Sequence, residues 1–504
     1  MSEQLFMGID IGTSGIRAAV FNKDGIQIKL SYKEYPLICT SKGMAELNPE
    51  VVFNSMTDVV RNCVEGIDKS EFLLSAIGLS TQMHSFIAVD RDGNCLTNVM
   101  TYADVRPMEE ANFINENFDC HELYFRTGCR AQHPKYPLSK MLWLKNKKSE
   151  IFDKTYKFIT IKEYIVYKLF GEFLIDITDA SATGCFNIHN FTWDEVILKD
   201  VLGVSSDMFG HPVECTHVLN MMNKEYADIM GINYITPVVI GSGDGIMANI
   251  GCGVFDDTKM SSTIGTSGAI RTAVSSPLLD EKGRTWCYCF TKDTWVAGGA
   301  INNGGIILKW LRDNYTREYE HDREACGLES IYDLFNKYSC EIKPGSEGLI
   351  FLPYLTGQSS PDWNAEAKGT LHGIQLIHGK KHFIRAAMEG VIYNLFSVYE
   401  AIMQINSSAR LIVANGGYVN SDIWLQIQAD IFNKEIAVAG VGEAAAFGAA
   451  FTAMAGIGAI SSLKQELPGM RPLKIIKPIN ENVDIYKTAY LKFKKLYSSI
   501  YKTS

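Results

Sequence analysis

One ten-residue segment has a near-copy in this chain, about half the chain length away. Residues 11–20 read IGTSGIRAAV and residues 264–273 read IGTSGAIRTA, so Gly12 and Gly15 correspond to Gly265 and Gly268. Each pair is separated by 253 positions (265 − 12 and 268 − 15) in a chain of 504 residues. A repeat at this distance indicates an internal duplication. We therefore expect an α/β protein with two related domains, residues 1–250 and 251–504.

The first copy predicts a β-hairpin that faces a phosphate group. An apolar strand leads to Asp10, residues 12–15 form the turn, and residues 16–21 form the return strand. Glycines let the backbone amides of a turn approach a ligand, and the hydroxyls of Thr13 and Ser14 add donors. The Asp10 carboxylate suits a hydrated Mg²⁺ ion. Two such hairpins suit the phosphate tail of a nucleotide, although a single one would be read as an ordinary polar turn.

Composition excludes several classes of protein. The formal charge is −9, and no Lys/Arg-rich block indicates a nucleic-acid surface. The twelve cysteines are scattered, with one C-x-C pair, which argues for a reducing compartment and against a zinc site or a disulfide framework. The amino terminus does not resemble a signal peptide, and residues 444–460 are too short and small-sided for a membrane span. We expect a cytoplasmic protein that binds neither nucleic acid nor membrane.

The first half has the order of an α/β domain that is not a Rossmann unit. A third antiparallel strand is predicted at 26–35, a helix at 51–65 with Asn48 as its N-cap, and a buried strand at 75–80. The last strand ends in a polar cluster at residues 81–85. Ligand sites of open α/β sheets lie beyond strand ends, so this cluster is a candidate substrate site. His84 alone is more typical of a structural histidine.

Two further segments supply acids and bases. Residues 236–245, TPVVIGSGDG, predict a strand that breaks into a glycine-rich turn carrying Asp244. A carboxylate at a strand end can accept the proton of a substrate hydroxyl as its oxygen attacks phosphorus; an ordinary Asp-Gly turn is the alternative. Arg130, His133 and Lys135 place basic groups on a loop where an acidic substrate would find partners, unless they are simply solvated.

The second half repeats the pattern and adds glycine-rich turns. A strand, a turn at Gly304–Gly305 and a helix follow the second hairpin, and the helix start can face a nucleotide. A strand at 411–415 runs into Gly416–Gly417, where backbone without side chains permits a flat adenine ring. Residues 382–399 predict a core helix, and the loop at 351–364 has the composition of a lid.

One motif argues for another chemistry but fails in context. Residues 440–445, GVGEAA, fit the G-x-G-x-x-A pattern of dinucleotide-binding proteins. That pattern also requires an acidic residue about 20 positions further on, after a strand, and the chain has none there. No G-x-x-x-x-G-K-[ST] loop is present either. A dehydrogenase and a P-loop enzyme are therefore both disfavoured.

Taken together, the two hairpins, the Gly-Asp-Gly segment and the paired glycines resemble the FGGY family of sugar and polyol kinases. The longest motif is GIQLIHGKKHFIRAAMEGVIYNL at 373–395, which is similar to the family signature ending Glu-Gly-x-x-Tyr-x-Leu. The resemblance implies the duplicated ribonuclease H-like fold of actin, hexokinase and chaperone ATPases, with two domains around a nucleotide cleft. The N-terminal domain would bind the substrate and the C-terminal domain the nucleotide.

The resemblance also implies roles for particular residues. Asp244 matches the catalytic base, and Asp10 lies at the Mg²⁺ of MgATP. The substrate-binding positions are Gln82, Met83, His84, Asp104, His133 and Lys135. The nucleotide-binding positions are Gly12, Thr13, Ser14, Arg17, Gly265, Thr266, Gly305, Lys309, Gly416, Gly417 and Ser421. Tyr102 replaces the usual Trp of a Trp-x-Asp motif, and Gln358–Ser360 replaces a common Glu-Arg.

Within the family, four segments are most similar to the gluconate kinase branch: HPKYPLSKMLWL at 133–144, IKEYIVYKLFG at 161–171, IGTSGAIR at 264–271 and NNGGIILKWLRD at 302–313. The implied reaction is ATP-dependent phosphorylation of a terminal hydroxyl of a sugar acid, D-gluconate first. A xylulokinase or another sugar kinase remains an alternative, as does a non-catalytic ATP-switched binding protein. The resemblance leaves a homodimer open.

Overall fold

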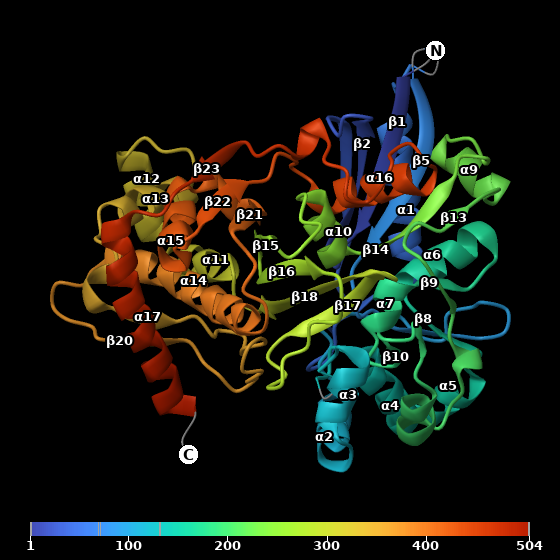
Figure 1. Cartoon of the computed structure of the whole chain (residues 1–504), viewed down its shortest axis with the longest axis horizontal. Helices are drawn as coiled ribbons and strands as arrows, with labels where there is room; N and C mark the ends of the chain where they lie inside the picture. The colour runs from blue at the N-terminus through green and yellow to red at the C-terminus, as the bar shows by residue number, and fades with distance from the viewer. Residues whose placement is uncertain (1–2, 69, 71, 131–132, 502–504) are drawn as a thin grey trace. The chain divides into compact units, whose positions relative to one another are not determined.

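The computed structural model describes residues 3–68, 70, 72–130 and 133–501, which form two compact units (Figure 1). The first unit consists of Met1–Phe255, Ala273–Val296 and Glu443–Arg471. The second consists of Asp256–Thr272, Ala297–Gly442 and Pro472–Ser504. The first segment ends close to the predicted boundary at residue 250, whereas 273–296 and 443–471 return to the first unit. A single division of the chain therefore does not describe the packing.

The first unit is built on a six-stranded sheet with the order β13-β14-β5-β1-β2-β3. Strands β1, β5 and β14 are parallel, and β1, β2 and β3 form an antiparallel meander. The bounds are β1 Glu3–Ile11, β2 Gly15–Asn22, β3 Gln27–Glu34, β5 Phe72–Thr81, β13 Val218–Leu219 and β14 Val238–Gly243. The predicted first hairpin and third strand are confirmed.

A seven-stranded sheet has the order β17-β18-β16-β15-β21-β22-β23. Its bounds are β15 Lys259–Ile264, β16 Gly268–Val274, β17 Trp286–Thr291, β18 Thr294–Ile301, β21 Leu411–Asn415, β22 Glu435–Val438 and β23 Lys474–Ile476. Strands β15, β21 and β22 are parallel, as are β1, β5 and β14, and β15 pairs antiparallel with β16 as β1 does with β2. The repeated segment thus occupies the same place in two similar sheets, which is the topology of a duplication.

The rest of the regular secondary structure in the described chain is mainly helical. In the first unit they are α1 Pro49–Val64, α2 Met108–Asn117, α3 Cys120–Thr127, α4 Pro137–Lys147, α5 Ser149–Lys154, α6 Ile161–Phe170, α7 Ile177–Ser181, α8 Glu195–Ile197, η1 Leu198–Leu202, η2 Ser206–Met208, α9 Lys224–Met230, α10 Asp244–Gly251, α16 Ala444–Gly456 and η5 Pro468–Met470. In the second they are α11 Ile306–Asn314, α12 Thr316–Ala325, α13 Ile331–Cys340, η3 Ser346–Gly348, α14 Lys380–Ile405, η4 Gly417–Asn420, α15 Asp422–Phe432 and α17 Asn480–Tyr501.

Short strands complete the secondary structure. They are β4 Glu46–Leu47, β6 Ile87–Val89, β7 Val99–Met100, β8 Lys157–Ile159, β9 Leu174–Asp176, β10 Phe186–Asn187, β11 Thr192–Trp193, β12 His211–Val213, β19 Ile350–Leu352 and β20 Thr370–His372. Most of them form two-stranded ladders between loops; β4 pairs with β7, and β6 with β8. The β4–β7 and β6–β8 ladders fix the chain segments that come before and after the loop at residues 101–107.

Helix α1 forms where the sequence predicts it and covers one face of the first sheet. The Asn48 side chain accepts hydrogen bonds from the amides of Glu50 and Val51, which satisfies donors that a helix start leaves unpaired. Apolar residues recur at spacings of three and four along it and join the core of β1, β2 and β5. The buried members are Val52, Phe53, Met56, Val59, Val60 and Cys63.

Helix α16 packs against the other face of this sheet, beside β1 and β5 (Figure 1). Glycines make this close approach possible. A Cβ atom at Gly8 of β1 would lie 1.7 Å from the carbonyl oxygen of Ala446, and one at Gly78 of β5 would lie 1.9 Å from that of Ala449. A larger residue at either position would push the helix off the sheet. The prediction of a buried helix near 444–460 is confirmed.

The structure corrects the prediction at Asp244. Residues 241–243 do not form a turn: β14 continues through Gly243, and Asp244 is the first residue of α10. The glycines instead serve the strand, because Gly241 has φ +66° and its Cβ would lie 1.7 Å from the carbonyl oxygen of Leu79. The carboxylate therefore lies at a helix amino terminus.

The segment predicted to be a lid packs inside the second unit. Ser359 donates from its hydroxyl to Asn302 at 2.6 Å, and the Ser360 amide donates to the carbonyl of Ala300 at 3.0 Å. Gln358, Ser359 and Ser360 are all buried. Movement of this loop remains a prediction.

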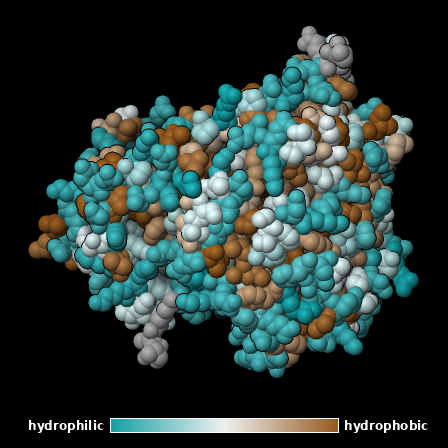
Figure 2. Space-filling view, viewed as in Figure 1, coloured by the Kyte–Doolittle hydropathy of each residue, from teal (hydrophilic) through white to brown (hydrophobic). Residues whose placement is uncertain are grey.

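Hydrophilic residues predominate on the face drawn in Figure 2, with hydrophobic residues interspersed. Within the described chain, no helix combines the length and the apolar character needed to cross a membrane.

Candidate active site

The strands of the first sheet end side by side and bring the predicted residues to one edge. Asp10 of β1 is in register with Ser80 of β5, and Ser80 is in register with Ser242 of β14. The segments that follow these three strands begin with Gly12, Gln82 and Asp244. The carboxyl ends of parallel strands are the usual place for a ligand in an open sheet. Three predicted site segments, far apart in sequence, are thus neighbours.

The turn between β1 and β2 is held by its own backbone and by Gln82. The Gly12 amide donates to the carbonyl of Gly15 at 3.0 Å, and the Thr13 hydroxyl donates to Gln82 Oε1 at 3.1 Å. Gln82 Nε2 in turn donates to the carbonyl of Gly12 at 3.2 Å. Because both ends of its amide are engaged, Gln82 ties the hairpin turn to the end of β5. Ser14 is exposed at the turn.

Asp10 is a buried carboxylate with one hydroxyl and one guanidinium partner. Ser80 Oγ donates to Oδ1 at 2.9 Å, and Arg17 Nη1 donates to Oδ2 at 3.3 Å. Burial outweighs these contacts and raises the pKa of Asp10. Arg17 Nε also pairs with Glu443 at 3.3 Å, and the pKa of Glu443 is raised by burial despite Arg17, with the Asp10 charge adding to the rise.

This arrangement fits a magnesium ion that arrives with phosphate. Mg²⁺ is typically held by one or two carboxylates and keeps several waters or phosphate oxygens. Asp10 and Glu443 supply two carboxylates about one guanidinium, and among the described residues no group of three or more His, Cys, Asp or Glu forms a complete metal cage. Sequence reasoning missed Glu443; its signal was the acidic residue inside the rejected G-x-G-x-x-A motif.

His84 lies in a buried, aromatic and positively charged environment. Its Nε2 is 3.1 Å from the Tyr288 hydroxyl, and the rings of Tyr136 and Tyr288 meet it edge-on at 5.2 and 5.9 Å. Burial, with Lys135 and Lys140 nearby, lowers the pKa of His84 well below its usual value. The imidazole is therefore neutral near pH 7. Its φ of 65° places it in the left-handed region, which non-glycine residues occupy at a cost.

The predicted basic loop contributes to the same environment. The Lys135 amide donates to His133 Nδ1 at 3.2 Å, and the Lys135 ammonium lies 4.8 Å from the centre of the Tyr136 ring. Burial lowers the pKa of Lys135 to about 8 and that of His133 to about 3. A buried ammonium is costly unless an anion shares its site. His84, two residues of this loop and one residue of α4 form what we call the basic cluster: His84, His133, Lys135 and Lys140.

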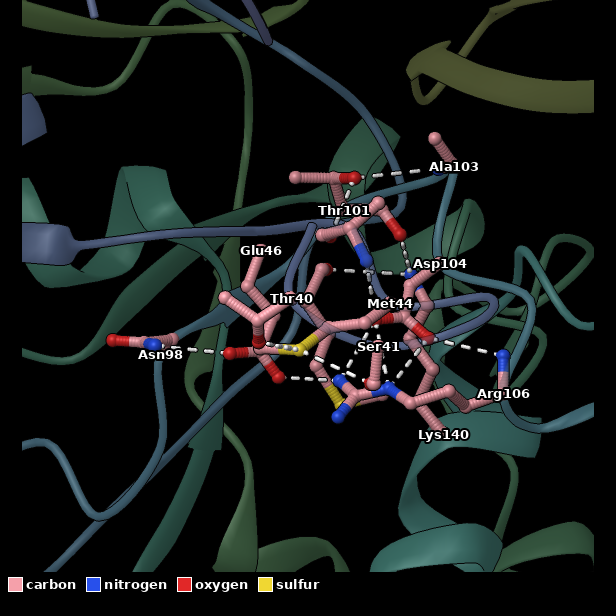
Figure 3. Close-up of polar contacts among 12 residues, drawn as sticks. Thr40, Ser41, Met44, Glu46, Asn98, Thr101, Ala103, Asp104, Arg106 and Lys140 are labelled. Carbon is pink, nitrogen blue, oxygen red and sulfur yellow. Dashed lines mark hydrogen bonds and ion pairs between the residues drawn. The ribbon is translucent and has the colours of Figure 1, made fainter. Parts of the chain in front are cut away.

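Asp104 lies in the polar network drawn in Figure 3, which Lys140 of the basic cluster also borders. Its carboxylate is fully buried and accepts hydrogen bonds from the amides of Ala45 at 3.0 Å and Arg106 at 3.1 Å. The Arg106 guanidinium donates to it at 2.7 Å and pairs on its other side with Glu46. The hydrogen-bond partners of Asp104 are thus backbone amides and a guanidinium of the same unit, and they organise the loop that carries Tyr102. Direct contact between Asp104 and the substrate stays a prediction.

Tyr102 lies close enough to Asp244 to feel the charge of its carboxylate. The Tyr102 side chain is about half exposed, and partial burial together with the Asp244 charge raises its pKa. Asp244 Oδ1 accepts from the amide of Gly245 at 2.6 Å, and the carboxylate lies at the amino terminus of α10. Met83 packs against the same strand end, because a Cβ at Gly243 would lie 2.5 Å from Met83 Cγ. The phenol of Tyr102 thus lies near the predicted base, at the position where the Trp-x-Asp motif usually has Trp.

The second unit contains a pocket of about 510 Å³ at the corresponding edge of its sheet. Of the seven positions predicted there for the nucleotide, six line it: Gly265, Thr266, Gly305, Lys309, Gly417 and Ser421. Gly416 lies outside the lining; it has φ +92°, and its Cβ would lie 2.7 Å from the carbonyl oxygen of Ile264. It shapes the turn on which Gly417 is presented.

Backbone hydrogen bonds join the two glycine-rich segments of this pocket. The Gly305 amide donates to the carbonyl of Gly265 at 2.7 Å, and the Gly304 amide donates to that of Thr266 at 3.0 Å. On the opposite side, Ser421 caps α15 and donates from its hydroxyl to Asn336 at 2.6 Å. Sequence reasoning missed the wall formed by the start of α13; its signal was the Ser330–Asp333 capping box. The lining residues there are Ser330, Tyr332, Asp333 and Asn336.

Comparison with known families decides the class of protein. The N-terminal domain profile of the FGGY family of carbohydrate kinases matches residues 5–251, and the C-terminal domain profile matches residues 260–457. The chain belongs to the FGGY family of carbohydrate kinases. It has the two-domain kinase fold of the actin and hexokinase class, as the sequence predicted, and kinases of this family use ATP as the phosphate donor.

Named relatives lie on two branches of the family. The chain is 38% identical to the gluconokinase of Bacillus subtilis (strain 168) over 96% of its length and 93% of the relative, and 28% identical to the xylulose kinase of the same strain over 98% and 96%. Among solved structures it is similar to a gluconate kinase and a xylulose kinase, both from Lactobacillus acidophilus. Each has 31% identity, a TM-score of 0.92 and 99% of this chain covered, with 98% and 99% of the neighbour.

Proposed function

We propose that this FGGY kinase phosphorylates the terminal hydroxyl of a sugar acid, D-gluconate first, with MgATP as the donor. The basic cluster is the observation that carries the proposal. Burial raises the cost of the Lys135 ammonium group in this cluster, and a substrate carboxylate would offset that cost in a way that a neutral sugar would not. The higher identity to gluconokinases than to xylulose kinases agrees with this choice.

In the proposed reaction, Asp244 is the general base. A substrate hydroxyl loses its proton to the Asp244 carboxylate as its oxygen forms a bond to the γ-phosphorus, and the bond from that phosphorus to the bridging oxygen of ADP breaks. Asp244 is the first residue of α10, where a helix amino terminus interacts favourably with a negative charge. Tyr102 and Met83 lie beside this carboxylate and border the space for the sugar chain. Met83, His84, His133 and Lys135 are the proposed substrate contacts, with Gln82 and Asp104 supporting them.

The second unit is proposed to bind the nucleotide. The pocket lined by Thr266, Gly305, Lys309, Gly417 and Ser421 has the volume and the exposed backbone that an adenine nucleotide requires. In the first unit, Gly12, Thr13, Ser14 and Arg17 would contact phosphate, and Asp10 with Glu443 would hold the magnesium ion, which neutralises phosphate charge when bound. The twelve cysteines are all free thiols, in keeping with a cytoplasmic location.

Xylulose is the second candidate substrate, since the two solved neighbours are equally similar in fold. A coupled assay with gluconate, xylulose, ribulose, glycerol and fuculose separates the candidates. We expect the highest kcat/KM with gluconate. Lys135→Met should lower kcat/KM for gluconate by about 10- to 100-fold, the value of a charge-assisted hydrogen bond, and change that for neutral sugars much less.

The assay has outcomes that reject the proposal. A higher kcat/KM with xylulose than with gluconate would make the protein a xylulokinase. ATP hydrolysis without any phosphorylated sugar would indicate an ATP-switched binding protein. Lys147→Met, on the exposed side of α4 where the lysine pairs with Glu109, serves as the matched control and should leave every substrate unaffected.

A further inference from the structure

Lys140 is a buried lysine whose ammonium group contacts three backbone carbonyls. It lies on α4 with none of its surface exposed, and its Nζ donates to the carbonyl oxygens of His84 at 2.5 Å, Thr101 at 2.8 Å and Met100 at 3.4 Å. Neither the repeat nor the predicted site residues drew attention to it. Three donors directed at three carbonyls use the whole hydrogen-bonding capacity of an ammonium group.

The three carbonyls belong to two different loops. His84 follows strand β5, whereas Met100 and Thr101 end strand β7 and begin the loop that carries Tyr102 and Asp104. Figure 3 shows Lys140 beside this second loop, close to Asp104 and Arg106. One side chain therefore joins the segment that presents the imidazole to the segment that presents the phenol near Asp244.

The backbone conformation of His84 suggests what the hydrogen bond from Lys140 does. With φ at 65°, the residue occupies a conformation that non-glycine side chains adopt only where the surroundings enforce it. The Lys140 ammonium holds the carbonyl of that same residue. A released carbonyl would let the peptide return to an ordinary conformation and would turn the imidazole away from Tyr288.

A purely structural lysine would not be placed in this way. Burial lowers the pKa of Lys140 to about 7; Asp104 opposes this shift, and Arg106 and Lys135 add to it. A methionine or leucine would fill the same volume in a helix without that cost. A buried ammonium group that contacts two loops of a candidate site, despite the cost of burying its charge, is typical of a residue that fixes the positions of those loops.

We propose that Lys140 is a positioning residue, which clamps the His84 and Tyr102 loops in the one arrangement that binds the sugar substrate. The inference rests on the proposed function in that it assigns the substrate to these loops. It does not depend on which sugar is phosphorylated, because the effect is measured on whichever substrate the wild-type enzyme turns over best.

The test compares Lys140→Met with Lys145→Met. Lys145 is on the same helix and also donates to a backbone carbonyl, that of Leu202 at 2.6 Å, away from both loops. We expect Lys140→Met to raise the KM for the sugar at least tenfold and to leave the KM for ATP within twofold. Hydrogen exchange should speed up at residues 82–86 and 100–104 and stay unchanged in the second unit. Lys145→Met should change none of these quantities.

Several results would overturn the proposal. Equal losses in the affinity for sugar and for ATP, or faster exchange spread over the whole first unit, would mean that Lys140 only supports the core. An unchanged KM for the sugar would mean that the loops need no clamp. If Lys140→Met gives no folded protein, Lys140→Arg is judged by the same criteria: a selective rise in the sugar KM supports the clamp, and any other pattern refutes it. A wild-type enzyme that phosphorylates no sugar would refute the proposed function first, before either variant is measured.

Discussion

Replacing Asp104 by asparagine tests whether this carboxylate holds a loop or contacts the substrate. The side chain is fully buried and accepts from two amides and from the Arg106 guanidinium. Asp104→Asn keeps the shape of the side chain but removes its charge, and it directs an amide NH₂ or a single oxygen at a guanidinium. Breaking a buried ion pair from one side costs about 3–5 kcal/mol. Since Arg106 keeps Glu46 and is 18% exposed, we expect the lower end, about 3 kcal/mol.

Urea unfolding at pH 7 measures this cost. With a slope of about 3 kcal/mol per molar urea, the unfolding midpoint should fall by about 1 M. Asp58→Asn is the matched control in the same unit, because its pair with Lys33 at 2.6 Å is on the surface, with the Asp58 side chain 40% exposed. Such surface pairs contribute about 0–1 kcal/mol, so its midpoint should move by less than about 0.3 M.

Kinetics of the same variant complete the argument. If Asp104 organises the loop, the KM for the sugar should rise together with the loss of stability. A lower temperature should then restore part of the affinity for the sugar. If Asp104→Asn unfolds at the wild-type urea concentration but loses affinity for the sugar, the carboxylate contacts the substrate directly. The assignment of Asp104 to the loop network would then be wrong.

Three further predictions follow from the two sites and the core. Asp244→Asn should lower kcat by about 100-fold or more, the usual contribution of a positioned base, with little change in the KM values; a kcat within fivefold of wild type would remove Asp244 as the base. Gly417→Val should raise the KM for ATP at least tenfold without changing the melting temperature, since a Cβ there meets no atom within 4 Å, and Gly379→Val, outside the pocket, is its control. Burial raises the pKa of Glu163 to about 8, so the folded chain holds a proton that the unfolded chain releases above about pH 4.5. The protonated Glu163 side chain therefore contributes fully to the free energy of unfolding below about pH 4.5, and this contribution is lost as the pH rises through 8. Glu163→Gln should flatten the pH dependence of urea unfolding between pH 5 and 8. An unchanged slope would mean that the pKa of Glu163 is not raised.

The sequence predicted both hairpins, several strands of the two sheets and helices α1, α14 and α16 because their signals are local, whereas α17 was not predicted. Turn chemistry at Gly12–Gly15, the cap at Asn48 and the apolar spacing in α14 each act over a few residues. The error at Asp244 has the same origin. A glycine-rich run was read as a turn, whereas Gly241 makes room for the carbonyl of Leu79 in a neighbouring strand, which no local pattern reveals.

Six of the seven predicted nucleotide positions of the second unit line its pocket for a related reason. They follow strand ends or open helices, and in a sheet of known order the ends of parallel strands come together. The wall from α13 was not predicted, because a capping box is common in helices that have no role in binding.

What a polar side chain does at a strand end depends on partners distant in sequence. Gln82 was assigned to the substrate, yet its amide is engaged by Gly12 and Thr13, 70 and 69 positions away. Glu443 lies near Asp10, 433 positions away in sequence (443 − 10), because α16 packs closely on the first sheet at Gly8 and Gly78.

The duplication explains why Glu443 and Asp244 lie at the same edge of the first sheet. Helices α10 and α16 follow equivalent strands of the two sheets, and each opens with an acidic residue at its amino end, Asp244 or Glu443. Since α16 packs beside α10 in the first unit, both acids serve one sheet edge. The repeat therefore predicts the pairing of strands, whereas the proximity of the two acids follows from the packing of α16 against α10 and the first sheet.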